Sequence, residues 1–210
     1  MNIHSFLKAL RLTTCIILTT SYTWAAPPSL QIGTPRILGT NCSSQNSSVA
    51  LSPDGNELSL IYDDYRVGTD RSQNLKSSHC TLILPLTLPA GYHLKITKAD
   101  YRGFNSLPEK SSSEFLAEYR FEGEVNQETR KKVKFNGPLL NEFYETHTVH
   151  SKSPCSTQVN LLINTLLSIE NKNLNENAFL QIDTLDVSQP HRKKDRKTRF
   201  QLSLKKCSEG

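Results

Sequence analysis

Short segments in which hydrophobic and polar residues alternate recur along this chain, with turn residues between them. In residues 48–65, apolar side chains alternate on both sides of the sequence SPDG, whose proline and glycine favour a turn, so this segment predicts a β-hairpin. The same alternation predicts further strands over residues 81–88, 92–101, 114–123, 129–137, 142–150, 158–170, 178–187 and 198–206.

In two of these segments, features other than alternation also bear on the predicted structure. Residues 158–170 are apolar enough for a helix, but their β-branched residues and the alternation of Val159 and Leu161 favour a strand. Pro85 interrupts residues 81–88 and predicts an edge strand or a bulge, because proline lacks an N–H for the sheet. Many short strands without helix starts predict an all-β fold, an antiparallel β-sandwich or jelly roll of about nine to ten strands.

The N-terminus has the pattern of an export signal. Lys8 and Arg11 precede an uncharged apolar run over residues 12–24, which ends in small residues that suit cleavage after residue 25. We therefore predict a signal peptide over residues 1–25 and a secreted protein, extracellular or periplasmic. The run is shorter than the roughly 20 residues that a membrane helix needs, so no transmembrane segment is expected.

The remaining residues suit one domain of ordinary size. Residues 26–40 are rich in proline and glycine and predict an irregular leader, and residues 41–210 predict a single disulfide-bridged β domain. Sequons for N-glycosylation begin at Asn41 and Asn46, and they are relevant only in a host that glycosylates. Removing the signal lowers the formal charge from +5 to about +3, because it removes two bases.

Four cysteines remain after cleavage, and an even number in an exported chain predicts two disulfides. Four cysteines allow three connectivities, among which the sequence does not decide. We favour Cys42–Cys80 and Cys155–Cys207, since each pair then joins neighbouring parts of the chain. No two cysteines have the short spacing of a zinc site, so no metal is expected at them.

A series of short motifs runs along almost the whole mature chain. They include SPDG at 52–55, LPAGY at 88–92, DYRG at 100–103, YRFEG at 119–123, FNGP at 135–138, SPC at 153–155, LLINT at 161–165 and KKC at 205–207. In this order, with the four cysteines, they resemble the secreted domain-of-unknown-function family 4360 of fungi and bacteria. The resemblance implies export and a compact cysteine-bridged β domain. It implies no catalytic residue, and HRKKDRKTR at 191–199 is more basic than the family leads us to expect.

The motif DYRG is the first candidate binding site. Tyr101 and Arg102 offer a stacking ring and a planar donor group to a sugar or carboxylate, Asp100 can accept hydrogen bonds from hydroxyls, and Tyr62 and Tyr65 are further candidate rings. The structural alternative is a strand end. In that case a glycine at 103 would permit a left-handed bend, Tyr101 would pack into the core, and Arg102 would pair with an acid.

Basic residues form two groups. Arg130, Lys132 and Lys134 share a strand face, and cross-strand ion pairs with Glu118 and Glu122 are the simplest prediction for them. The second group is either a solvated loop or an anion-binding one, whose partners would be acidic polymers or lipid headgroups; nucleic acid is unlikely because no aromatics are interleaved. It comprises Arg192, Lys193, Lys194, Arg196, Lys197 and Arg199.

The acids and histidines show no catalytic pattern. Asp63, Asp64 and Asp70 lack the regular spacing of a calcium loop, and no serine lies in a nucleophile elbow. We expect no cofactor and no metal, and the question of catalysis stays open, with a non-catalytic role favoured.

We therefore predict a non-catalytic β-sandwich that binds a cell-envelope or extracellular polymer, either a glycan or an anionic chain. The alternatives are a protein-interaction module, such as an adhesin or inhibitor, and a hydrolase with an unrecognised site.

Overall fold

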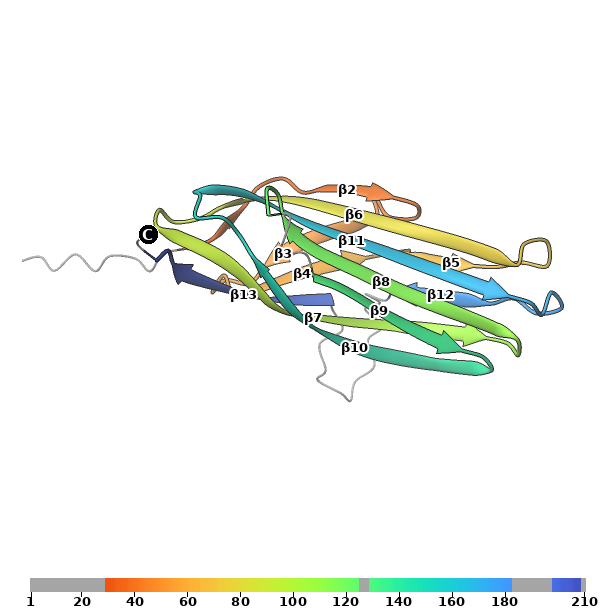
Figure 1. The fold of residues 1–210 in the computed structure, drawn as a ribbon. Helices are drawn as coiled ribbons and strands as arrows, with labels where there is room; N and C mark the ends of the chain where they lie inside the picture. The colour runs from red at the N-terminus through yellow and green to blue at the C-terminus, as the bar shows by residue number, and fades with distance from the viewer. Residues whose placement is uncertain (1–28, 125–128, 183–197, 209–210) are drawn as a thin grey trace, which may run out of the picture.

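The computed structural model describes residues 29–124, 129–182 and 198–208. These residues form thirteen strands and no helix, in two antiparallel sheets (Figure 1). The predicted signal peptide lies outside the described residues. Within the described part of the chain, no helix is long and apolar enough to cross a membrane.

The first sheet, sheet A, has the order β1-β6-β11-β8-β9, with β2 also paired to β6. All of its pairs are antiparallel, and β11 pairs along most of its length with both β6 and β8. Its strands are β1 (Gln31–Ile32), β2 (Arg36–Gly39), β6 (Leu75–Thr87), β8 (Ser111–Phe121), β9 (Thr129–Asn136) and β11 (Gln158–Asn171).

The second sheet, sheet B, is organised around β7. On one side of β7 lies β10, and on the other side β13 pairs with its first half and β12 with its second half. Beyond these, β4 and β3 follow β13, and β5 follows β12. The strands are β3 (Ser47–Leu51), β4 (Glu57–Tyr62), β5 (Arg66–Gly68), β7 (Tyr92–Leu107), β10 (Leu139–Lys152), β12 (Phe179–Ile182) and β13 (Thr198–Lys206).

The predicted β-sandwich is confirmed, and the predicted strands are present, several of them longer than expected. Residues 158–170 form a strand, as their alternation indicates. The predicted strand over 178–187 is described only to residue 182. The predicted irregular leader is partly wrong, because residues 31–32 and 36–39 add two short strands to β6.

Those two short strands explain the proline in β6. The strand is internal, so the predicted edge position of Pro85 is wrong. The carbonyl of Pro85 accepts a hydrogen bond from the N–H of Gly33, at 2.8 Å, in the gap between β1 and β2. The N–H and C=O of one residue point to the same side of a strand. The N–H that proline lacks would therefore also point into this gap, where no strand residue accepts a hydrogen bond from it.

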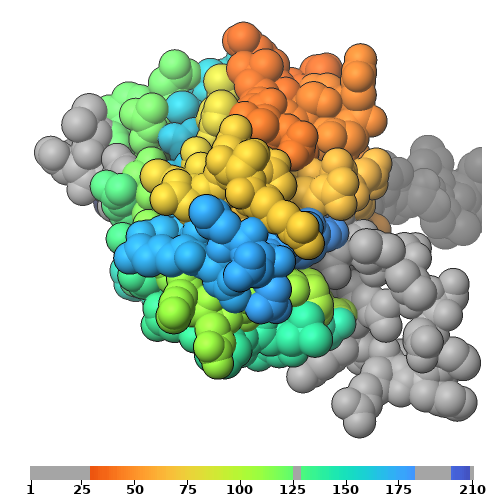
Figure 2. All heavy atoms as spheres, turned by 90° about the vertical axis from the view of Figure 1, so that its right-hand side faces the viewer, coloured from red at the N-terminus to blue at the C-terminus, as the bar shows by residue number. Residues whose placement is uncertain are grey.

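The core lies between the two sheets. Leucine, isoleucine and aromatic side chains alternate inward from both, including the fully buried Leu82, Leu94, Phe115, Leu161 and Phe200. At one end, the turns that join the long strands gather together (Figure 2). Burial of this apolar surface is the main force that holds the sheets together.

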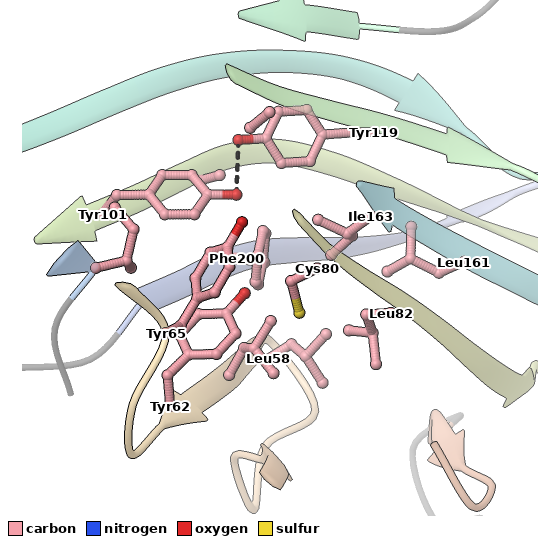
Figure 3. Close-up of a cluster of buried hydrophobic side chains, with 14 of the residues drawn as sticks. Leu58, Tyr62, Tyr65, Cys80, Leu82, Tyr101, Tyr119, Leu161, Ile163 and Phe200 are labelled. Atoms are coloured by element: carbon pink, nitrogen blue, oxygen red, sulfur yellow. Dashed lines mark hydrogen bonds between the residues drawn. The ribbon is translucent and has the colours of Figure 1, made fainter. Parts of the chain in front are cut away.

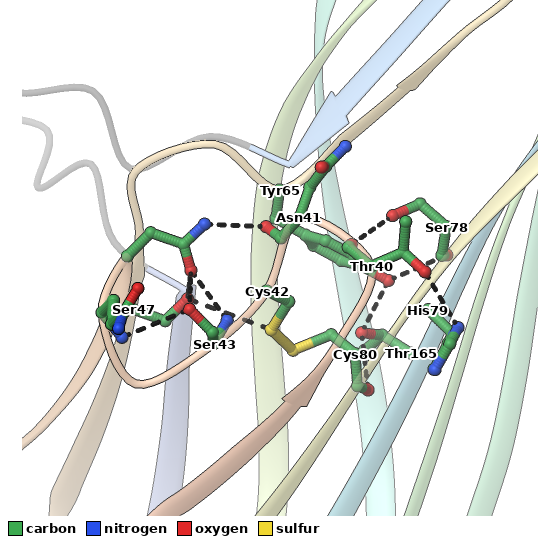
Figure 4. The surroundings of a disulfide bond; sticks show 12 residues. Thr40, Asn41, Cys42, Ser43, Ser47, Tyr65, Ser78, His79, Cys80 and Thr165 are labelled. Atoms are coloured by element: carbon green, nitrogen blue, oxygen red, sulfur yellow. Dashed lines mark hydrogen bonds between the residues drawn. A yellow bond between two sulfur atoms is a disulfide. The ribbon is translucent and has the colours of Figure 1, made fainter.

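Both predicted disulfides are confirmed. The bond between Cys42 and Cys80 joins the loop before β3 to β6, and therefore links the two sheets (Figure 4). In the same loop, the side chain of Asn46 accepts a hydrogen bond from the N–H of Ser43, at 2.7 Å, and donates one to the carbonyl of Asn41. The amide of this sequon is thus a structural part of the loop.

Candidate functional site

The DYRG motif lies inside a strand. β7 continues to Leu107, so the expected strand end at Gly103 is wrong, and Gly103 does not have a positive φ angle. From Ala99 to Leu107 the side chains of β7 alternate: Tyr101 points into the sandwich, and Asp100 and Arg102 lie on the outer face of sheet B. The motif therefore contributes to the core and to the surface at once.

Gly103 is required for close packing. A Cβ atom at this position would collide with the backbone carbonyl of Gln181 in β12 and with the ring of Phe143 in β10. Glycine here lets β12 and the buried ring of Phe143 approach β7 without strain.

The three candidate tyrosines lie in the core. Tyr62, Tyr65 and Tyr101 are 3%, 0% and 1% exposed, so the prediction that their rings present a stacking surface is wrong (Figure 3). Tyr62, at the end of β4, and Tyr65, just before β5, both point inward, and their rings lie 5.0 Å apart. Burial raises the pKa of all three hydroxyls well above the usual value, so they stay neutral.

A buried polar network joins the two sheets at these rings. The hydroxyl of Tyr119 in β8 donates to that of Tyr101, at 2.9 Å, and lies 2.6 Å from Nδ1 of His147 in β10. The hydroxyl of Thr165 in β11 donates to that of Tyr65, at 3.0 Å. Burial, assisted by the charge of Lys131, lowers the pKa of His147 to about 4, so this imidazole is neutral in the folded protein.

On the outer face, the charged residues of the motif have partners. Asp100 lies 2.7 Å from Nζ of Lys98 and accepts a hydrogen bond from the hydroxyl of Thr146, also at 2.7 Å. Arg102 forms an ion pair with Glu142 of β10. The structural alternative for the motif is thus confirmed for Tyr101 and Arg102.

Strand register gathers further side chains beside Arg102. Phe104, two residues along β7, stands between Gln181 of β12 and Glu142 of β10. Tyr144 lies opposite Arg102 and is 62% exposed. We call the set the sheet B face; its members are Arg102, Phe104, Glu142, Tyr144, Phe179 and Gln181.

The sheet B face is flat and partly aromatic. Phe104 and Phe179 are partly exposed, and the guanidinium of Arg66 in β5 lies 5.9 Å from the centre of the Phe179 ring. With strands about 4.8 Å apart and side-chain rows about 6.6 Å apart, three rows on four strands cover roughly 14 Å by 13 Å. Three rings and several planar hydrogen-bonding groups therefore share one surface.

Sequence reasoning missed five of the six members of this face, the three rings as well as Glu142 and Gln181, because their neighbours are distant in the chain. Phe104, Tyr144 and Phe179 come from β7, β10 and β12, and only the pairing of these strands brings them together. For Phe104, the sequence did contain a signal, because alternation along the strand places it on the same face as Asp100 and Arg102.

Two of the three acids considered for calcium, Asp64 and Asp70, have other partners. Asp64 pairs with Arg66 at 2.6 Å, and Asp70 lies 3.0 Å from Nζ of Lys76 and accepts hydrogen bonds from Ser72. These contacts, led by the Ser72 hydroxyl, lower the pKa of Asp70. Across residues 29–124, 129–182 and 198–208, no three carboxylates come close enough to share a metal ion.

A groove of about 310 Å³ lies on sheet A. Its lining is mixed, with polar residues such as Glu122, Gln158 and Asn160 beside apolar ones such as Pro85 and Val159. The amide of Asn160 donates to Glu122 at 2.6 Å. No aromatic ring lines the groove.

The two basic groups have different outcomes. On sheet A, Arg130 pairs with Glu118 at 3.2 Å, as predicted, but Lys132 pairs with Glu114 at 2.7 Å and not with the predicted Glu122, whose carboxylate accepts a hydrogen bond from Asn160. The proposed anion-binding residues Arg192, Lys193, Lys194, Arg196 and Lys197 lie outside the described residues. Arg199 belongs to β13, opposite Asp100.

The comparison with known families is decisive for identity. Residues 28–207 match the domain of unknown function DUF4360. The chain belongs to the DUF4360 family. The resemblance found in the short motifs is therefore confirmed, and the DUF4360 match also includes the two short strands β1 and β2.

One relative of this DUF4360 protein is an uncharacterized secreted protein of Arthroderma benhamiae. The two are 30% identical over 158 residues, which cover 71% of this chain and 63% of the relative, so the chain spans less than two thirds of that protein. The relative agrees with the predicted export, and the DUF4360 chain is accordingly a secreted protein.

Among solved structures, the chain is similar to TmCBM61 in complex with β-1,4-galactotriose. The match has 12% identity and a TM-score of 0.31, and covers 82% of this chain and 88% of that one. A TM-score this low supports no conclusion about the ligand of the DUF4360 domain.

Proposed function

We propose that this secreted domain is a non-catalytic module that binds a neutral glycan of an envelope or extracellular matrix along the sheet B face. The observation that carries the proposal is the register that collects Phe104, Tyr144 and Phe179 beside Arg102, Glu142 and Gln181 on one flat surface. No pocket is needed for such a ligand, because a polymer can lie across a sheet.

The chemistry of this surface suits sugars. The apolar C–H face of a pyranose ring packs against an aromatic ring, and sugar hydroxyls both donate and accept hydrogen bonds. Arg102 offers donors, Glu142 offers acceptors, and an amide such as that of Gln181 offers both. Tyr144 adds an exposed ring with its own hydroxyl.

The charges of the surface favour a neutral polymer over an anionic one. Arg102 is paired with Glu142, Lys98 with Asp100, and Arg66 with Asp64. Each of these three cations thus has an acid beside it, which reduces attraction for a polyanion. Binding to the sheet B face should change little as the salt concentration rises. Binding through the basic residues 192–197 should instead weaken steeply with added salt.

The test is a pull-down of the mature protein on insoluble cellulose, chitin, mannan and polygalacturonate, at low and high salt. We expect salt-resistant retention on a neutral polymer, reduced about tenfold in Tyr144→Ala. Leu75→Ala is the matched control, since Leu75 is 66% exposed on β6 of the other sheet. Equal retention of both variants would refute the sheet B face, and salt-sensitive retention lost on neutralising 192–197 would favour an anionic polymer.

A further inference from the structure

The two disulfides of this protein lie in opposite environments. Cys42 and Cys80 are 1% and 2% exposed, beneath the loop before β3. Cys155 is exposed and Cys207 partly exposed, at the end of the sandwich where β13 ends. A reductant from solution therefore reaches the second disulfide directly and the first only after the loop opens.

A buried histidine lies against the exposed disulfide. His93, near the start of β7, is 6% exposed, and its Nδ1 is 3.9 Å from Sγ of Cys155. Its Nε2 is buried and has no hydrogen-bond partner. One donor atom from each of His93, Cys155 and Cys207 lies within 4.8 Å of the others.

Hydrogen bonds fix Cys207 directly, and the segment that leads to Cys155, independently of the S–S bond. The N–H of Cys207 donates to the carbonyl of Gly91 at 2.8 Å, beside His93. Ser153, two residues before Cys155, is joined to Leu94 by two bonds, from its N–H to the carbonyl at 2.8 Å and from the Leu94 N–H to its hydroxyl at 2.9 Å. Cleavage of the disulfide would leave its two sulfurs near the imidazole.

We propose that Cys155–Cys207 is a reducible disulfide whose dithiol form, together with His93, binds a thiophilic divalent cation of the zinc class. A dithiol reductant supplies two electrons and two protons, which convert the disulfide to two thiols while the reductant becomes a disulfide. The cation then displaces two protons as both thiolates and a ring nitrogen coordinate it. Two cysteines and one histidine leave a fourth position for water or another ligand.

The distances and charges around His93, Cys155 and Cys207 determine what a bound cation needs at this site. Zinc bonds of about 2.0–2.3 Å place tetrahedral ligand atoms less than about 4 Å apart. After reduction the two sulfurs must therefore separate, and the ring nitrogen of His93, within 4.8 Å of both, must move slightly closer. The positive charges of Lys95, Lys152 and Lys205 surround His93 and oppose a cation. Both thiolates are therefore required, and neither cysteine suffices alone.

The first part of the test is selective reduction. The oxidised mature protein is treated with graded tris(carboxyethyl)phosphine, its free thiols are alkylated, and the labelled cysteines are identified by mass spectrometry. We expect Cys155 and Cys207 to be labelled at reductant concentrations that leave Cys42 and Cys80 bonded. Simultaneous reduction of both disulfides would overturn the proposal.

The second part uses Co²⁺ as the probe and Zn²⁺ as its competitor. The selectively reduced protein should develop a thiolate-to-cobalt charge-transfer band that Zn²⁺ abolishes, and the oxidised protein should not. The band should be lost in Cys155→Ser, and His93→Gln should weaken cobalt affinity at least tenfold. His150→Gln, at an exposed histidine of β10, is the matched control. An undiminished band in Cys155→Ser would overturn the proposal even if selective reduction were observed.

Discussion

Adjacent residues of this chain serve opposite sides of one sheet. Tyr101 lies in the core against Tyr119, and Arg102 lies on the sheet B face beside Glu142. The surroundings of Tyr101 are polar as well as aromatic, because the hydroxyl of Tyr119 is hydrogen-bonded both to the hydroxyl of Tyr101 and to the ring of His147. A buried polar network of this kind is stable only while each member keeps its partner.

This network predicts a pH-dependent stability. The folded protein holds His147 neutral down to a pKa of about 4, whereas the unfolded chain protonates it near pH 6.5. The unfolded state therefore binds the extra proton first, and the free energy of unfolding should fall as pH decreases from about 6.5 to about 4, by up to about 3 kcal/mol from this group. Urea unfolding at pH 7.5 and pH 4.5 measures the change.

Comparison with His147→Gln isolates the contribution of this imidazole from those of the carboxylates. The variant should lose part of the pH dependence, and His150→Gln should keep all of it. Identical pH dependence in the wild type and His147→Gln would show that the imidazole does not carry the effect.

At the scale of elements, β7 is the strand on which sheet B depends. It receives β10 along one edge, and β13 and β12 share its other edge. Gly103 lies where β12 and the ring of Phe143 both approach. This position has no freedom for a side chain, although no positive φ angle requires a glycine there.

Gly103→Ala should therefore destabilise the protein by about 1–3 kcal/mol, since the added methyl group overpacks a closed site. The measurement is the urea midpoint, with Ser106→Ala in the same strand as a control at a partly exposed position. A Gly103→Ala midpoint equal to that of the wild type would mean that β12 can move away without cost.

Local pattern was enough to predict strands, because alternation of side chains depends only on neighbours in the chain. It identified residues 158–170 as a strand against their helical composition. It could not supply the pairing of β7 with β10 and β12, which are separated from it by tens of residues. The sheet B face arises from that pairing, so only Arg102 and Asp100 could be nominated in advance, together with core tyrosines whose orientation the sequence left open.

At the scale of the whole molecule, two layers are joined by a core and by a cross-link. The bond between Cys42 and Cys80 connects β6 of sheet A with the loop that leads into sheet B. It closes a loop with a sequence separation of 38 residues, which the chain-entropy model values at about 4 kcal/mol.

Replacing both Cys42 and Cys80 by alanine should accordingly lower the free energy of unfolding by about 4 kcal/mol. Urea unfolding under non-reducing conditions gives this value directly. A loss below about 1 kcal/mol would show that the core and the loop hydrogen bonds hold the sheets together without the cross-link.

A binding isotherm on the polymer retained in the pull-down measures directly whether the sheet B face binds a neutral glycan. An exposed ring that stacks on a sugar contributes about 1–1.5 kcal/mol, so Tyr144→Ala should raise the dissociation constant about tenfold at both low and high salt. Leu75→Ala should bind as the wild type does. Unchanged affinity in Tyr144→Ala, or no retention of the wild type on any neutral polymer, would show that the sheet B face does not bind a neutral glycan.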